Sequence, residues 1–338
     1  MASAETSPIA VLRARGSAID GGNAAVVLLL VGAAIFLLVG CLQSTLFAQY
    51  TVQGLALGSV YGGLALALVL VYRATHVINF AQGELAMLTT YIAYQLMQWG
   101  LSYWAAFAAT LAIAFALGTA LQVTIIRPVQ RSVIAVVIVT VGLFILIDGI
   151  VNWIWGADFK VLQSPFGFAS FDVGGVAIPH KDVWVIGVVL VSVFLVWGLF
   201  RFTKVGLGMR AAALRPAAAA LVGVRVDSML AIGWGLAAVL GAVAGLMAEP
   251  SQLFLTPSFM QPILVYAFAA AVLGGLESPA GALVGGLAIG VSLTLIVGYV
   301  PQKYIGTELQ LPLAFAVLLL ILLVKPSGLF GRREVRRV

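Results

Sequence analysis

The sequence has few charged residues and few side chains that bind metals. Of its 338 residues, Lys and Arg account for 18 and Asp and Glu for 12, so 9% are charged while 62% are hydrophobic. A soluble domain carries about a quarter charged residues, and disorder needs low hydrophobicity with high net charge, so both classes are excluded. A single Cys excludes a disulfide scaffold, and with only two His residues no metal-ligand cluster is expected. A polytopic membrane protein remains.

Catalytic and nucleotide-binding motifs are also missing. No Gly-Lys dipeptide occurs anywhere, so the chain has no Walker A sequence and we expect it to bind no ATP through a P-loop. Gly206-x-Gly208-x-x-Ala211 mimics a dinucleotide fingerprint, but it follows an apolar helix where the fingerprint requires a strand. Because no Ser-His-Asp or metal constellation is present, we expect a chain that is not an enzyme and binds no cofactor.

Long apolar stretches dominate the sequence that is present. About 20 apolar residues cross a bilayer as a helix, and lipid leaves backbone polar groups no other partners. We therefore predict an all-α integral membrane protein, a polytopic helical bundle of about ten spans (8–10) with broken helices. The membrane-spanning domain would cover 24–328, between an N-terminal extension at 1–23 and a basic tail at 329–338. The ten stretches are 24–47, 52–72, 83–98, 103–126, 132–154, 183–201, 229–248, 261–276, 279–299 and 311–325.

The basic residues predict the orientation of these spans. With ten spans and the N-terminus in the cytoplasm, only Lys160, Lys181 and Lys303 of the 18 basic residues fall outside. Lys and Arg accumulate on the cytoplasmic side of membrane proteins, so we expect a multi-pass protein of a bacterial inner membrane with both termini cytoplasmic. The net charge of +6 is then explained by topology and contact with anionic lipid headgroups. Basic residues spread along membrane edges favour no nucleic-acid partner.

Two segments between the spans are long enough to form structure of their own. The predicted outer loop, 155–182, contains QSPFGF and FDVGGVAIPH, whose turn residues and short β-prone runs indicate a small hairpin or lid. The predicted inner loop, 202–228, is alanine-rich and basic. An amphipathic or short surface helix lying against the membrane face fits that composition.

Glycines repeat at helical spacing in several spans. Small faces let membrane helices approach closely, so ordinary helix packing is favoured, with a dimer face or pore lining as the alternative. The repeats are Gly54, Gly58 and Gly62; Gly241 and Gly245; Gly281 and Gly285; and Gly286 and Gly290.

Polar residues interrupt the apolar pattern at three places. The first, 72–84, contains Asn79, Gln82, Gly83 and Glu84, and either forms a broken helix near a conduction path or is a cytoplasmic turn in which Glu84 caps the next helix. A second interruption sits at a similar point in the C-terminal half, and paired interruptions indicate a transport path. It contains Gly274, Gly275, Glu277 and Ser278.

The third interruption lies within the predicted span 132–154. Asp148 and Asn152 are one helical turn apart on the same face. They are either a locally satisfied polar pair near the outer boundary or direct ligands of a transported solute.

Three segments in order carry a family resemblance. QGLALGSVYGGLALALVLVYRATHVINFAQGELAML at 53–88 resembles the opening signature of the LivH-type permeases of branched-chain amino acid ABC importers, although that family often has His where this chain has Gln82. The segment at 206–227 resembles the family's cytoplasmic coupling loop, with Ala217 where Glu is common. The segment at 271–282 is similar to the late Gly-Gly-x-Gly-Ser signature, with Glu277 replacing Gly. Together they span about 50–328.

The resemblance implies a transmembrane subunit that works by alternating access. Its partners would be a second, LivM-like permease, two cytoplasmic ATPases that hold ATP and Mg²⁺, and an extracytoplasmic substrate-binding protein docking near 155–182. The ATPase-coupling residues carried over by the resemblance are Arg210, Arg215, Ala218, Ala219, Leu221 and Gly223.

Other functions stay open on the sequence alone. The same architecture could import urea, short amides or other amino acids. A stand-alone secondary transporter or channel is more remote, because it usually needs buried ionisable residues and Glu84 and Asp148 are the available candidates.

Overall fold

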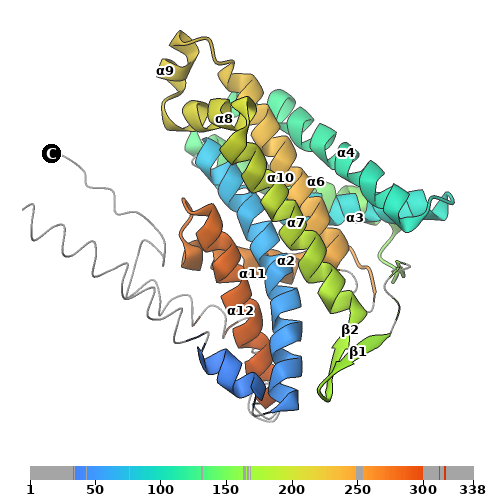
Figure 1. The fold of residues 1–338 in the computed structure, drawn as a ribbon. Coiled ribbons are helices and arrows are strands. Elements are labelled where there is room, and N and C mark those ends of the chain that lie inside the picture. The colour runs from blue at the N-terminus through green and yellow to red at the C-terminus, as the bar shows by residue number, and fades with distance from the viewer. Residues whose placement is uncertain are drawn as a thin grey trace, which may run out of the picture.

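The computed structural model describes residues 33, 35–42, 44–75, 77–130, 132–162, 165, 167, 169–248, 254–299, 312 and 316. The N-terminal extension, the basic tail and nearly all of the stretch 311–325 lie outside these residues, as does the first half of the stretch 24–47. Figure 1 shows a bundle of helices with a small β-hairpin at one end.

Six helices are long and apolar enough to cross a membrane. They are α2 (Thr45–Thr75), α4 continuing through η1 and α5 (Tyr103–Val129), α6 (Val133–Trp155), α7 (His180–Phe202), α10 (Val226–Ala248) and α12 (Pro279–Tyr299). The continuous run Tyr103–Val129 has three parts: α4 is Tyr103–Leu121, η1 is Gln122–Ile126 and α5 is Arg127–Val129. The all-α membrane prediction is confirmed for the described residues.

Two of the predicted spans form shorter helices. α3 (Gln82–Gln98) has 17 residues and α11 (Met260–Gly274) has 15, which at 1.5 Å per residue is about 25 Å and 22 Å, less than the ~30 Å hydrocarbon core. These two helices, and the two terminal stretches that lie largely outside the described residues, leave the count of ten spans unconfirmed.

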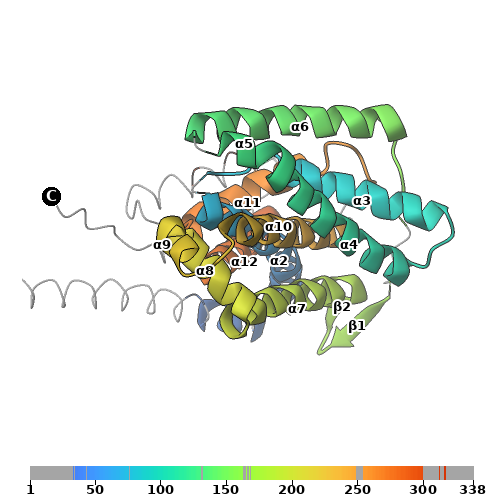
Figure 2. The same ribbon diagram turned by 90° about the horizontal axis from the view of Figure 1, so that it is seen from above.

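α2 forms the core of the bundle. Its residues from Gly58 to Val71 are all buried, and it packs most extensively against α12, with α10, α11 and α7 around it. Figure 2 shows α2 at the centre in the view from above, with α6 and α7 on opposite flanks. A helix that is apolar all round and buried at this length is the expected centre of a membrane bundle.

The predicted glycine packing is confirmed within the chain. A Cβ on Gly54 would lie 2.6 Å from Val291 Cα, and one on Gly58 would lie 2.8 Å from the Gly286 carbonyl oxygen. A Cβ on Gly290 would in turn meet the backbone of Gly58. The glycine faces of α2 and α12 therefore meet each other, and those of α10 and of the first turn of α12 meet α3 and α11. These glycines serve helix packing.

The two loop segments lie at opposite ends of the bundle (Figure 1). At one end β1 (Ser170–Val173) pairs antiparallel with β2 (Val176–Pro179). Their two-residue turn has Gly174 and Gly175 at φ 62° and 83°, as a primed hairpin turn requires. At the other end are α8 (Lys204–Leu214) and α9 (Pro216–Leu221). The hairpin and the short surface helices expected from the sequence are both present, and the membrane side of each stays a prediction.

Candidate functional site

The first polar interruption is a compact turn between α2 and α3. Thr75 Oγ1 donates to the Val71 carbonyl at 2.9 Å and closes the last turn of α2. Asn79 Oδ1 then accepts from the Ala81 N–H at 3.1 Å, which is an Asx-type turn. The side chains of Asn79, Gln82 and Glu84 are all buried, so this segment packs into the protein and is not a solvated connection.

Gln82 ties the start of α3 to α10. Its Oε1 accepts from Asn79 Nδ2 at 3.1 Å, and its Nε2 donates to the Ala237 carbonyl at 3.0 Å. One turn after Ala237, a Cβ on Gly241 would lie 2.7 Å from Gln82 Nε2. The glycine therefore gives the amide the room it needs. A buried amide with both ends paired fixes one arrangement of two helices, because either unpaired end would cost a desolvation penalty.

Glu84 lies in the first turn of α3 and is 1% exposed. Neither of its carboxylate oxygens has a hydrogen-bond partner among the described residues. Asp148 of α6 and Gln261 of α11 lie close enough to interact with it electrostatically. The α3 N-terminus carries no side-chain cap, so the capping interpretation gains no hydrogen bond, although the helix dipole still favours an anion here. A buried carboxylate in this setting is a candidate functional group.

Asp148 and Asn152 form the local pair that their spacing suggested. Asn152 Nδ2 donates to the Asp148 carbonyl at 2.9 Å and to Asp148 Oδ2 at 3.3 Å. The structure also brings Asp148 near Glu84, a proximity that the sequence did not indicate. A role for either carboxylate in binding solute stays a prediction.

The second polar interruption is a tight turn between α11 and α12. Gly275 has φ 95°, a conformation that glycine adopts at no cost. Ser278 Oγ accepts from the Gly281 N–H at 3.0 Å and caps α12, with Pro279 as its first residue. A Cβ on Gly274 would collide with the backbone of Gly281. Glu277 is exposed, whereas Glu84 is buried.

The segment α8–α9 is built as a short, well-defined projection. Thr203 Oγ1 accepts from the Gly206 N–H at 3.0 Å and starts α8. α9 begins with Pro216. At its end, the Gly223 N–H donates to the Ala220 carbonyl and the Val224 N–H to the Ala219 carbonyl, both at 3.0 Å. With Gly223 at φ 84°, these two bonds form a Schellman motif.

This projection presents apolar side chains to its surroundings. Leu221 is 89% exposed and Val222 is 79% exposed, and Leu214 at the end of α8 is also exposed. Of the predicted coupling residues, Arg215 and Ala218 are exposed, Arg210 is half-buried, and Ala219 is buried against the chain. Exposed apolar residues on a short rigid element rimmed by arginine mark an interaction surface.

Gln122 is a buried polar residue that the sequence analysis did not single out. Gln122 begins the five-residue π-helix η1, which lies between α4 and α5 in the run Tyr103–Val129. It is buried, and neither side-chain polar atom has a partner among the described residues. π-helical turns often accompany functional sites. The available signal was a lone Gln in the apolar stretch 103–126, but nothing in the sequence marks a π-helix. Across the described residues, no three His, Cys, Asp or Glu side chains are grouped to hold a metal ion.

Comparison with known proteins connects these features to a family. Residues 50–322 match the family described as the permease component of the branched-chain amino acid transport system. The chain is 29% identical over 312 residues to the high-affinity branched-chain amino acid transport system permease protein LivH of Escherichia coli, covering 88% of this chain and 99% of that protein. It is also 29% identical over 309 residues to BraD, the corresponding permease protein of Pseudomonas aeruginosa, covering 86% and 98% of the two chains.

A solved structure, PsaBC from Streptococcus pneumoniae in complex with Fab, has a chain that aligns at 15% identity with a TM-score of 0.46, over 85% of this chain and 94% of that one. The relatives with clear sequence identity match this chain over almost their whole length, and the matched residues contain the turn at 79–84, the segment α8–α9 and the second interruption. The chain therefore belongs to the family of branched-chain amino acid transport system permease components and is a LivH-type permease subunit of an ABC importer.

Proposed function

We propose that this chain carries branched-chain amino acids into the cell by alternating access, powered by two separate ATPase subunits in the cytoplasm. The observation that carries the proposal is the match to LivH and BraD over nearly the full length of those permeases. A second permease subunit would pair with this one, and an extracytoplasmic binding protein would deliver the solute.

The segment α8–α9 is proposed as the contact to an ATPase subunit. Its exposed Leu214, Leu221 and Val222 supply an apolar surface that a groove on another protein could cover. Arg215 at the α8–α9 junction adds positive charge at the rim. Pro216 at the start of α9 and the Schellman motif at its end hold these side chains in one geometry, as a segment that transmits motion by rigid contact requires.

The orientation follows from that assignment. The α8–α9 end would face the cytoplasm, in agreement with the positive-inside rule. The hairpin β1–β2, at the opposite end (Figure 1), would then face outward, where a binding protein docks. Phe171 on β1 stacks against the His180 ring with 4.0 Å between centroids, which orders the hairpin on the start of α7.

The solute path is proposed near Glu84 at the start of α3. The buried carboxylate of Glu84 lies on α3, the half-buried Asp148 on α6 and Gln261 on α11, and α3 packs against both of the other helices, so three helices converge there. Most of α6 is exposed apart from a buried stripe at positions such as Val136, Thr140 and Leu143. A second permease or lipid must cover that apolar face, and a path between two permeases would run close to this convergence.

Transport by the reconstituted complex tests the proposal. Proteoliposomes containing this chain, its partner permease and two ATPases should accumulate labelled leucine when binding protein and ATP are supplied. Unlabelled isoleucine and valine should compete, whereas urea and acetamide should not. Competition by urea or acetamide alone would favour the same architecture with an amide substrate.

The stand-alone transporter alternative gives a different result in the same assay. Proteoliposomes containing only this chain should neither hydrolyse ATP nor accumulate leucine. Leucine accumulation without the ATPases would remove the ABC importer proposal.

A further inference from the structure

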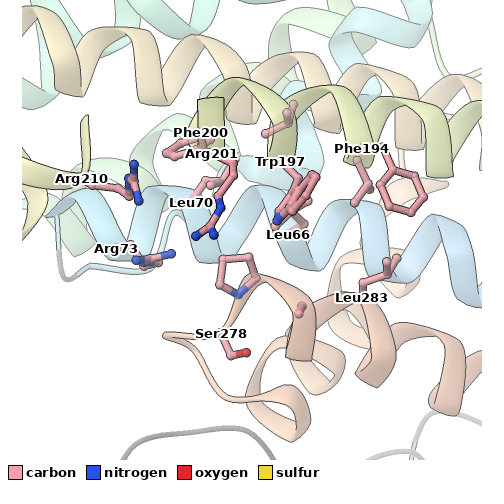
Figure 3. A pocket seen from close by; sticks show the side chains of 14 residues that line it. Leu66, Leu70, Arg73, Phe194, Trp197, Phe200, Arg201, Arg210, Ser278 and Leu283 are labelled. Carbon is pink, nitrogen blue, oxygen red and sulfur yellow. The ribbon is translucent and has the colours of Figure 1, made fainter. Parts of the chain in front are cut away.

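A pocket of about 430 Å³ opens between α2, α7, α8 and the first turn of α12. Its wall is mostly apolar, with Leu66 of α2, Trp197 of α7 and Leu283 of α12 among its members. Figure 3 shows arginines gathered toward one end of the pocket and apolar side chains, including Phe194 and Leu283, toward the other. The pocket is therefore amphipathic along its length, and neither the solute path nor the α9 surface uses it.

Three cations meet at the charged end. Arg73 closes α2, Arg201 closes α7 and Arg210 lies on α8. No acidic residue is among the described residues that line the pocket. Arg73 already takes part in an interaction of its own, so the argument rests on Arg201 and Arg210. Arg210 Nε donates to the Gly206 carbonyl at 3.4 Å, which holds its side chain along α8 beside the pocket.

The start of α12 adds positive potential at the same end. Ser278, Pro279 and Ala280 line the pocket, and they form the cap and first turn of α12. The N-terminus of a helix attracts anions through its dipole, which is the contribution that α12 makes here, because Pro279 has no N–H and the Gly281 N–H already donates to Ser278 Oγ. Arginines placed together beside a helix N-terminus repel one another unless an anion lies between them, so this end of the pocket is suited to a phosphate group.

The apolar end of the pocket adjoins exposed apolar side chains on α7. Along α7, Val191, Phe194 and Leu195 are exposed next to the pocket. In a membrane helix that surface meets acyl chains. A free phosphate would use the arginines and leave the apolar wall uncovered. A molecule with an anionic head and an apolar tail matches both ends.

We propose that this pocket binds an anionic phospholipid of the leaflet at the α8–α9 end, with its phosphate held by Arg201 and Arg210 and an acyl chain lying along Leu66, Trp197 and Leu283. The lipid would then bridge α2, α12 and the first helix of the coupling segment. Arginine is suited to this contact because its planar guanidinium pairs two N–H groups with phosphate oxygens.

Trp197 provides a direct probe, because it lines the pocket. The assembled transporter with the full-length chain is placed in phosphatidylcholine vesicles containing either brominated phosphatidylglycerol or brominated phosphatidylcholine, since bromine quenches tryptophan fluorescence on contact. The Trp197 signal is the difference between this chain and Trp197→Phe. Each basic residue near an anionic headgroup contributes about fivefold in affinity, so phosphatidylglycerol should quench Trp197 at a roughly 25-fold lower membrane fraction than phosphatidylcholine.

Removing the two arginines separates this pocket from general membrane charge. Arg201→Gln with Arg210→Gln should abolish the preference for phosphatidylglycerol. The charge-matched control, Lys204→Gln with Arg225→Gln, removes two exposed cations that do not line the pocket and should leave the preference intact.

Two results would overturn the proposal. Equal quenching by both lipids in the unaltered chain would show that the pocket does not select an anionic head, and that comparison needs no arginine variant. An absence of Trp197 quenching in the assembled transporter, with quenching present in the isolated chain, would show that a partner subunit covers the pocket.

Discussion

The packing of α2 against α12 can be tested with two Gly→Ala substitutions, one at their contact and one on an exposed helix face. Gly58 of α2 faces α12, where an added Cβ would lie 2.8 Å from the Gly286 carbonyl oxygen and from Leu287 Cα. Carbon atoms in contact sit about 3.5–4.0 Å apart, so α2 and α12 would have to separate by roughly 0.7–1.2 Å. Gly187 of α7 has nothing within 4 Å of its added Cβ, so the same change there meets no obstacle.

The two substitutions should move stability in opposite directions. Overpacking of this kind costs about 1–3 kcal/mol, so we expect Gly58→Ala to lower the free energy of unfolding by that amount. Alanine is up to about 1 kcal/mol better than glycine inside a helix, so Gly187→Ala should be neutral or stabilising. The cost at Gly58 falls on the most extensive helix contact in the bundle, where neither side has a flexible side chain to move aside.

The assay is unfolding of the full-length chain in dodecyl maltoside by increasing fractions of SDS, followed by circular dichroism. Gly58→Ala changes a buried helix face and Gly187→Ala an exposed one. The difference between the two variants in free energy of unfolding therefore reports the α2–α12 contact. Equal stability of Gly58→Ala and Gly187→Ala would refute the close approach of these two helices.

Three further predictions concern the site and the coupling segment. Gln82→Leu should cost about 1–3 kcal/mol in the same unfolding assay, because it removes the side-chain bond to the Ala237 carbonyl and leaves the buried Asn79 Nδ2 without its acceptor; unchanged stability would argue against the amide bridge. Glu84→Gln should keep the fold, because neither carboxylate oxygen has a hydrogen-bond partner among the described residues, but it should lower leucine uptake roughly tenfold, because the negative charge available to a solute in the proposed path is lost; normal uptake would favour a purely structural carboxylate. Gly223→Val should abolish ATPase coupling while the chain still inserts, whereas Gly100→Val, at a similar positive φ of 93° with open space around it, should strain the backbone equally and leave coupling intact; a defect in both would indicate general misfolding.

Local sequence patterns predicted the helices and their packing faces well. The apolar stretches 183–201 and 279–299 correspond to α7 and α12 within a few residues, because length and apolarity determine a spanning helix. The spacing of Gly286 and Gly290 predicted a close helix contact, which the α2–α12 crossing confirms. The paired glycines in FDVGGVAIP predicted the hairpin turn that Gly174 and Gly175 form, since backbone conformation there depends on local residues.

Features that depend on tertiary contact were not predictable. The Gln82 to Ala237 bond joins residues 155 positions apart, and the proximity of Glu84 to Asp148 depends on how α6 packs on α3. The stretch 103–126 read as one regular span, yet it contains the π-helix η1, whose extra residue per turn leaves no mark on apolar composition. The stretches at 83–98 and 261–276 match α3 and α11 within two residues at each end, but apolar composition alone does not establish whether helices this short cross the membrane.

The central claim is that α9 contacts an ATPase subunit, and crosslinking tests it most directly. Cys41 is the single cysteine of the chain, so Cys41→Ser gives a background free of native thiols. In that background Leu221→Cys places a thiol on the exposed end of α9, and Phe171→Cys places one on the hairpin at the opposite end. A short reagent that carries a maleimide and a benzophenone is then attached to the introduced thiol in the assembled transporter and irradiated, so that the benzophenone bonds to a C–H group of the neighbouring chain and needs no thiol there. We predict a crosslinked product containing an ATPase subunit from Leu221→Cys and none from Phe171→Cys. The reverse pattern, or no ATPase product from Leu221→Cys in an intact complex, would contradict the account.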